Sequence, residues 1–223
     1  MISKADSAKI RILEILAMTG EMTGENIKAF FSSGEYVRKT ITALKNESLI
    51  RKSSEKGKPV YRLTSKGRLK LKEVLPDVFE PLLEGRKTMN KTRDDDRRIE
   101  RRNKLIEVLL ILHRADVKIF PDEKVLLRKE IVDTRTDNID KIKFVENSYP
   151  EFYTAVEIKE IIPDFNIAKG SRSLGILVSY GRVYIIYSTY DGELLWWKET
   201  EIKFRTCARL CMSKKLFGND EVS

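Results

Sequence analysis

The sequence predicts an α+β protein with two unlike halves. Within residues 5–75, apolar side chains recur at helical spacings of three and four, and two short strand-like segments around a turn interrupt this pattern. In the second half, apolar runs joined by turn residues predict a small, mainly antiparallel sheet. Residues 84–96 are almost free of apolar side chains. We therefore expect an N-terminal domain at 1–83, a linker at 84–96 and an α+β domain at 97–223.

The composition is that of a soluble globular protein. Of the 223 residues, 41% are hydrophobic and 35% are charged. No run of about 18 apolar residues occurs, and Met1–Asp6 lacks the features of a signal peptide. These observations predict a cytoplasmic protein that does not enter a membrane.

Few residues are suited to metal or cofactor chemistry. The single histidine, His113, lies in an apolar helical run and is expected at the edge of the core. Cys207 and Cys211 are four positions apart, without histidines to complete a zinc site, and are expected to be ordinary thiols. Walker, dinucleotide-binding and G-x-S-x-G motifs are all missing. We expect no catalytic residue, no metal and no cofactor.

The positive charge is concentrated at the N-terminal end. The formal net charge is +9, and residues 1–92 hold 19 Lys and Arg against 11 Asp and Glu. Residues 105–223 are nearly balanced, with 18 against 19. A basic excess confined to one domain favours a nucleic-acid partner, although a solvated surface also accounts for it.

Three helices are expected in residues 1–48 of the N-terminal domain. The first begins near Ser3 and stops at Gly20. Thr23 caps a second, shorter helix, and a capping box between Ser32 and Glu35 opens a third. The residues expected to face the core are Ile10, Leu13, Leu16, Ala17, Ile27, Phe30, Phe31, Val37, Ile41 and Leu44.

The opposite face of the third helix is polar and rich in side chains that read bases. Arg can bond guanine through two hydrogen bonds, Asn can do the same with adenine, and Thr can contact a thymine methyl group. A solvated helix face of mixed charge is the alternative explanation. The candidate base-reading residues are Ser33, Glu35, Tyr36, Arg38, Lys39, Thr42 and Asn46.

A basic hairpin is expected next. Its strands are predicted at 49–52 and 60–64, joined by a flexible tip at 53–59. Its cations are suited to phosphate contacts, which position a protein without reading sequence. These candidates are Arg51, Lys52, Lys56, Lys58 and Arg62. A further helix is expected from Thr64 to Pro76.

The order of these elements resembles the winged helix-turn-helix transcription regulators. The resemblance rests on the helix-turn-helix pattern, on Ser48–Ile50 and the basic hairpin, and on Tyr61–Gly67, which is similar to the "YxLTxxG" run that closes the wing in those families. It implies double-stranded DNA as the partner, with the third helix in the major groove, and a homodimer on paired half-sites. One departure is Glu47–Ser48, which stands where a glycine is common.

The second half predicts a mixture of helices and strands. A helix is expected at 97–114, a turn at 120–123, and apolar strands at 174–179 and 182–188. Residues 152–161 fit either a strand or a capped helix. A short strand at 194–197 and a helix at 199–216 complete the expected elements. This half is expected to support dimerisation or to bind a protein partner.

The overall plan also resembles the replication-relaxation-type proteins of plasmids and integrative conjugative elements. The segments that carry this resemblance are "FYTAVEIK", "SRSLGILVS" and "YIIYSTYDG". It implies an accessory DNA-binding protein of a mobile genetic element, acting in transcriptional control, replication or conjugation.

Two other functions are compatible with the sequence. One is a magnesium-dependent nuclease of the PD-(D/E)xK type, with Glu157 and Lys159 on a strand and Asp133 or Asp140 as a second metal ligand. Against it, Thr154 and Glu157 fit a capping box, which would place Glu157 in the first turn of a helix. The other is a protein-binding scaffold. We expect that the chain is not an enzyme.

Overall fold

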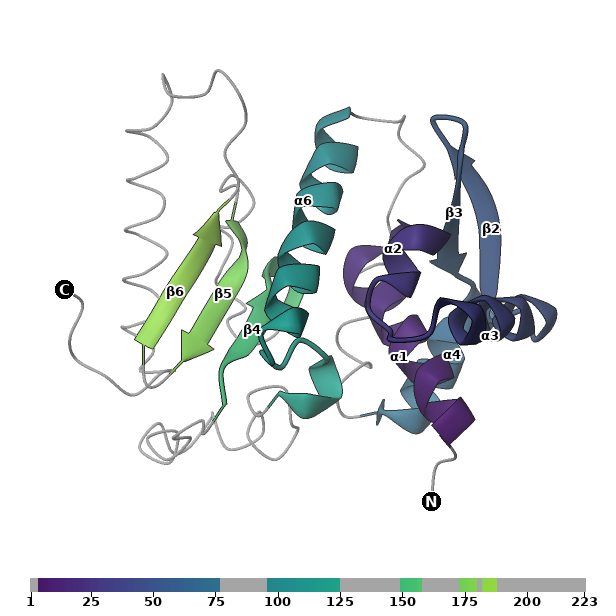
Figure 1. Cartoon of the computed structure of the whole chain (residues 1–223), viewed down its shortest axis with the longest axis horizontal. Helices are drawn as coiled ribbons and strands as arrows, with labels where there is room; N and C mark the ends of the chain where they lie inside the picture. Colours follow the sequence, from purple (N-terminus) through teal and green to yellow (C-terminus); the bar gives the residue numbers. More distant parts are fainter. Residues whose placement is uncertain (1–3, 77–95, 125–148, 158–172, 180–181, 188–223) are drawn as a thin grey trace. The chain divides into compact units, whose positions relative to one another are not determined.

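The computed structural model describes residues 4–76, 96–124, 149–157, 173–179 and 182–187. It contains helices and two three-stranded antiparallel sheets, which confirms the predicted α+β class (Figure 1). None of the described helices is long and apolar enough to cross a membrane.

The chain divides into two compact units. The first comprises residues 1–113 and 120–122, and the second comprises residues 114–119 and 123–223. The helix that follows the expected linker is thus grouped, as far as His113, with the N-terminal elements. The linker itself, apart from Asp96, lies outside the described residues.

Helices α1 (Lys4–Thr19) and α2 (Gly24–Lys28) begin and end close to the predicted positions. Gly20 ends α1 with a φ of 86°, a conformation that glycine adopts without strain, and its N–H donates to the Leu16 carbonyl. Thr23 caps α2 by accepting from the Asn26 N–H at 3.2 Å. The residues of these two helices that are buried in the core include Ile12, Leu13, Ile15, Leu16 and Ile27.

Helix α3 (Gly34–Asn46) begins one residue later than the predicted capping box implies. Ser33, not Ser32, is the N-cap, because its backbone is extended and its Oγ accepts from the Tyr36 N–H at 3.4 Å. Glu35 then lies in the first turn and pairs with Lys39, four residues along, at 3.1 Å. The predicted core positions are confirmed, since Val37, Ile41 and Leu44 are all buried.

The first sheet has the strand order β1–β3–β2, with β1 at Glu21–Thr23, β2 at Ile50–Glu55 and β3 at Lys58–Leu63. Strand β1 was not expected, since three residues carry too little periodicity to predict a strand. The predicted seven-residue tip is wrong: β2 and β3 pair as far as Glu55 and Lys58, so the turn is only Lys56–Gly57. Both turn residues have positive φ, of 47° and 77°, as the tight turn of a twisted hairpin requires.

The connection from α3 to β2 shows how Ser48 replaces the glycine that is common at this turn in winged-helix regulators. Ser48 adopts a φ of 59°, the left-handed conformation for which glycine is usual. The Ser48 N–H donates to the Lys45 carbonyl and the Leu49 N–H to the Leu44 carbonyl, so the end of the helix is satisfied without glycine. Thr64 then caps α4 (Ser65–Val74) and donates from its hydroxyl to the Ser48 carbonyl at 2.6 Å.

Helix α6 (Asp96–Arg114) matches its prediction, and its last residues lie at the core edge of the first unit. His113 Nε2 lies 3.2 Å from the Phe30 carbonyl, and its ring is between those of Phe30 and Phe120. The expectation for His113 is therefore confirmed. The 3₁₀ turn η1 (Pro121–Glu123) follows at the predicted turn.

The second unit contains the sheet β4–β5–β6, formed by Glu151–Thr154, Ser173–Ser179 and Arg182–Tyr187. The two predicted apolar strands are confirmed. The ambiguous segment is first a strand and then a helical turn, because Thr154 and Glu157 form a reciprocal capping box. Residues 133–147, 194–197 and 199–216, with both cysteines, lie outside the described residues.

A buried carboxyl group, that of Glu14, lies on α1. Arg11 on α1 pairs with Glu14 at 2.9 Å and with Asp122 at 2.5 Å, and its guanidinium lies 4.2 Å from the centre of the Phe120 ring. Burial raises the pKa of Glu14 from its ordinary value of 4.5 to about 8, and the Asp122 carboxylate adds to this rise while Arg11 opposes it. The folded protein therefore favours a protonated Glu14 at neutral pH.

Because the pKa of Glu14 is higher in the folded than in the unfolded state, ionisation favours unfolding between about pH 4.5 and about pH 8. The variant Glu14→Gln mimics the protonated acid. It should be more stable than the wild type at pH 8, by on the order of 2–4 kcal/mol, and equal to it near pH 4. Urea denaturation followed by circular dichroism at several pH values measures this difference.

The matched control is Glu107→Gln, which removes an exposed carboxylate from α6. It should follow the wild type at every pH. A Glu14→Gln protein that is no more stable than the wild type at pH 8 would show that Glu14 is ionised without penalty in the folded state.

Candidate nucleic-acid interface

The polar face of α3 is exposed as predicted. Val37, Thr40, Ile41 and Leu44 are buried and attach the helix to the core. The helix amphipathicity that produced the prediction thus separates the two faces. All the predicted base-reading residues, Ser33, Glu35, Tyr36, Arg38, Lys39, Thr42 and Asn46, are exposed.

These exposed residues differ in how far they are already engaged. The Ser33 hydroxyl caps the helix, and Lys39 and Glu35 pair with each other in solvent. The Thr42 hydroxyl donates to the Arg38 carbonyl at 3.0 Å. Tyr36 is an exposed aromatic side chain near the start of the helix. The fork of Arg38 is exposed beside them.

The hairpin cations divide into two groups. Arg51, Lys52, Lys56 and Lys58 are exposed, as a phosphate-contacting role requires. Arg62 is only partly exposed, and its Nη2 donates to Glu21 on β1 at 2.5 Å. The two residues are directly opposite each other in the register of β1 and β3. Arg62 therefore serves an ion pair within the sheet.

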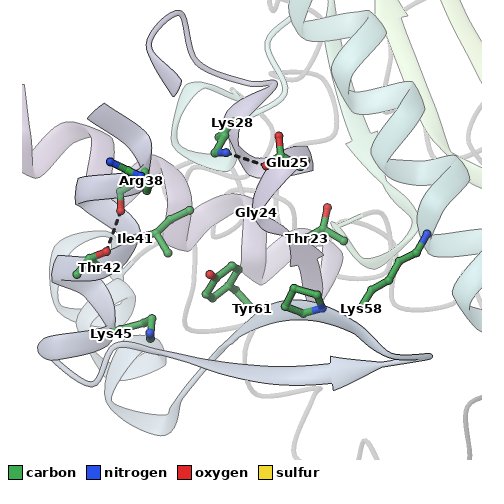
Figure 2. Close-up of a pocket in the computed structure, with 11 residues that line it drawn as sticks. Thr23, Gly24, Glu25, Lys28, Arg38, Ile41, Thr42, Lys45, Lys58 and Tyr61 are labelled. Carbon is green, nitrogen blue, oxygen red and sulfur yellow. Dashed lines mark hydrogen bonds and ion pairs between the residues drawn. The ribbon is translucent and has the colours of Figure 1, made fainter. Parts of the chain in front are cut away.

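A cleft of about 540 Å³ lies between α2, α3 and the hairpin (Figure 2). Ile41 and Tyr61 form an apolar part of its wall. Figure 2 shows Arg38 and Thr42 on the α3 side, whereas the Lys58 side chain starts at the hairpin edge and extends away from the cleft, towards α6. Its lining residues are Thr23, Gly24, Glu25, Lys28, Arg38, Ile41, Thr42, Lys45, Lys58, Pro59 and Tyr61.

The cleft brings together cations from two separate helices. Lys28 comes from α2, and Arg38 and Lys45 come from α3, whereas Glu25 is the single acidic residue in the lining. Lys58 of β3 borders the cleft, but its side chain extends away from it. Glu25 pairs with Lys28 at 2.7 Å. These three cations against one anion leave an excess of two positive charges around a concave surface, which attracts a polyanion.

Two of these cations escaped the sequence analysis. Lys45 lies three positions after Thr42 on the polar face of α3, so helical spacing was sufficient to find it. Lys28 lies on α2, and only the packing of α2 beside the hairpin shows that it belongs to the same surface. Strand register and helix packing bring together residues that are distant in sequence, and the periodicity of the sequence does not reveal these contacts.

The structure does not place Glu157 where the nuclease hypothesis requires it. Glu157 lies in the first turn of a helix, is fully buried and pairs with Lys124 at 2.6 Å, so it is not on a strand. Lys159, Asp133 and Asp140 lie outside the described residues. Within the described ranges, no three His, Cys, Asp or Glu side chains gather in a way that would hold a metal ion.

Comparison of the chain with models of protein families, with curated proteins and with solved structures finds no significant match. The function is therefore inferred from the geometry and charge of the chain itself.

Proposed function

We propose that this protein binds double-stranded DNA through a winged helix-turn-helix domain in its first unit. The observation that carries the proposal is the cleft between α2, α3 and the hairpin, where cations of α2 and α3 surround one concave surface beside the exposed face of α3. Three helices followed by a short basic hairpin are the element order of that fold. The positive charge of the chain is concentrated in the same region.

In the proposed complex, α3 enters the major groove with Arg38, Thr42 and Asn46 towards the base edges. The sugar-phosphate backbone beside that groove then passes over the cleft, where Lys28 and Lys45 neutralise phosphates. The hairpin, acting as the wing, extends along the next stretch of backbone with Arg51 and Lys52. Phosphate contacts set the register, and base contacts on α3 supply specificity.

The proposal extends to assembly and biological role. A homodimer would present two copies of α3 to paired half-sites, with the second unit supplying dimerisation or a protein partner. Sedimentation of the free protein and of its DNA complex measures this, and a monomer in both states contradicts it. The role we propose is that of a cytoplasmic regulator or accessory protein of a plasmid or conjugative element.

The proposed phosphate contacts determine how binding responds to salt. If Lys28, Lys45, Arg51, Lys52 and Lys58 each meet one phosphate, log K should fall with log salt at a slope of about −4 to −5, at roughly −0.9 per contact. Replacing Lys45 and Lys52 together by Gln should make the slope shallower by about 2. Fluorescence anisotropy with a labelled duplex from around the gene, against a scrambled duplex, measures both values.

The control for charge alone is the double replacement of Lys70 and Lys104 by Gln. These lysines lie on α4 and α6, are exposed, and do not line the cleft. Their loss should leave the slope unchanged. Equal effects of the two double replacements would show that binding follows net charge and would remove the cleft from the interface. No binding of the wild type to any duplex at low salt would reject the proposed function.

Arg38 is the residue most suited to read a base. Arg38→Ala should cost about 1–3 kcal/mol on the preferred duplex and relax the preference at one base pair, because a two-hydrogen-bond contact to guanine is lost. Competition with duplexes that differ at single positions measures the preference.

Lys39→Ala is the comparison variant on the same helix. Its side chain pairs with Glu35, so its loss should weaken binding to all duplexes by the same modest factor. An unchanged base preference in Arg38→Ala would place another side chain of α3 in the reading role.

A further inference from the structure

Arg102 on α6 joins two acidic residues of the first sheet that are far from it in sequence. Its Nη1 donates to Glu55 at 2.8 Å and to Glu21 at 2.7 Å, and its Nη2 also donates to Glu55. Arg62 completes the group by donating to the other oxygen of Glu21. Two guanidinium groups and two carboxylates thus alternate across the sheet and helix α6.

This charged group is largely withdrawn from water. The side chains of Arg102, Glu21 and Glu55 are only 11%, 8% and 9% exposed. Salt screens the attraction within such a shielded pair far less than it screens a surface pair. Removing one partner destabilises the protein strongly, because the remaining buried charge is then uncompensated. Arg102 is therefore the residue that compensates both of these shielded carboxylates.

The register of the hairpin shows what Glu55 would otherwise do. Glu55 and Lys58 are directly opposite each other on β2 and β3, with their side chains on the same face. Opposite charges in such cross-strand positions attract each other. Yet Glu55 bonds to Arg102, and Lys58 makes no ion pair with any described residue. Arg102 competes with Lys58 for the same carboxylate.

We propose that Arg102 is a positioning residue for DNA binding, which draws Glu55 away from Lys58 and so leaves the exposed Lys58 ammonium, on the hairpin next to the cleft but directed away from it, for a DNA phosphate. Arg102 itself contacts no phosphate in this arrangement. The inference rests on the proposed DNA-binding function. If the inference is correct, the hairpin presents all of its cations to DNA only when α6 is packed against the first sheet.

The test is a double-mutant cycle on the full chain, with binding to labelled duplex measured by anisotropy across a salt series. Arg102→Met keeps the apolar stem and removes the charge. Glu55 should then pair with Lys58, which should weaken binding about five- to tenfold at low salt and make the salt slope shallower by about 0.9. Lys58→Met should give a similar loss. The double variant should bind no more weakly than Lys58→Met alone, because both changes remove one phosphate contact.

Three further variants separate this role from a structural one. Adding Glu55→Gln to Arg102→Met should restore the slope, because Lys58 then has no carboxylate to pair with. Arg102→Lys keeps the charge and should remain near wild-type affinity. Lys104→Met removes one charge from an exposed position of the same helix and should change nothing.

Each result has one meaning. Additive losses from Arg102→Met and Lys58→Met, or an unchanged slope in Arg102→Met, overturn the inference while leaving the DNA-binding proposal intact. If Arg102→Met does not fold, the folded double variant Glu55→Gln with Arg102→Met decides, since a slope shallower than that of the wild type overturns the inference. Failure of the wild type to bind any duplex overturns both proposals.

Discussion

The register of β3 is the constraint from which the rest of the first unit follows. Because β3 is hydrogen-bonded to β1 on one side and to β2 on the other, each of its residues has a fixed neighbour in both strands. This places Arg62 opposite Glu21 and Lys58 opposite Glu55, and it puts Tyr61 in the wall of the cleft. A slip by one residue would exchange the two faces of the strand and remove all of these relationships together.

The sequence predicted those parts of this arrangement that depend on local patterns. Helix α3 was recognisable because its apolar residues recur at helical spacing, and its exposed face followed from the same spacing. The three-residue strand β1 was not, since it exists only through its pairing with β3. The partners of Arg62 were equally hidden, because Glu21 lies 41 positions away and no local pattern links the two. The tight hairpin was missed because Ser53 and Ser54 suggested a loop, whereas pairing extends the strands past them.

Buried acidic side chains recur in both units, and each is held by a cation from another part of the chain or from a neighbouring turn. Glu14, which favours its protonated form, is contacted by Arg11, whereas Glu55 forms an ion pair with Arg102 and Glu157 forms one with Lys124. Such pairs contribute little net stability, because removing both charges from water costs about as much as their attraction returns. Leaving one partner unpaired is expensive, however. The pairs therefore favour the observed packing strongly over any alternative packing in which the two charges are buried apart from each other.

This internal pairing changes what the charge count means for binding. Basic residues outnumber acidic ones in residues 1–92. Arg11 and Arg62 there, like Arg102 on α6, are engaged with carboxylates inside the first unit. The cations available to a polyanion are those on the outer face of α3, along the hairpin and around the cleft. Their placement, more than the total of +9, determines how many phosphates can be met at once. If Glu55 formed an ion pair with Lys58, the hairpin would present one fewer available cation, although the composition of the chain would be the same. Arg102 on α6 therefore affects the charge of a surface to which it does not itself belong.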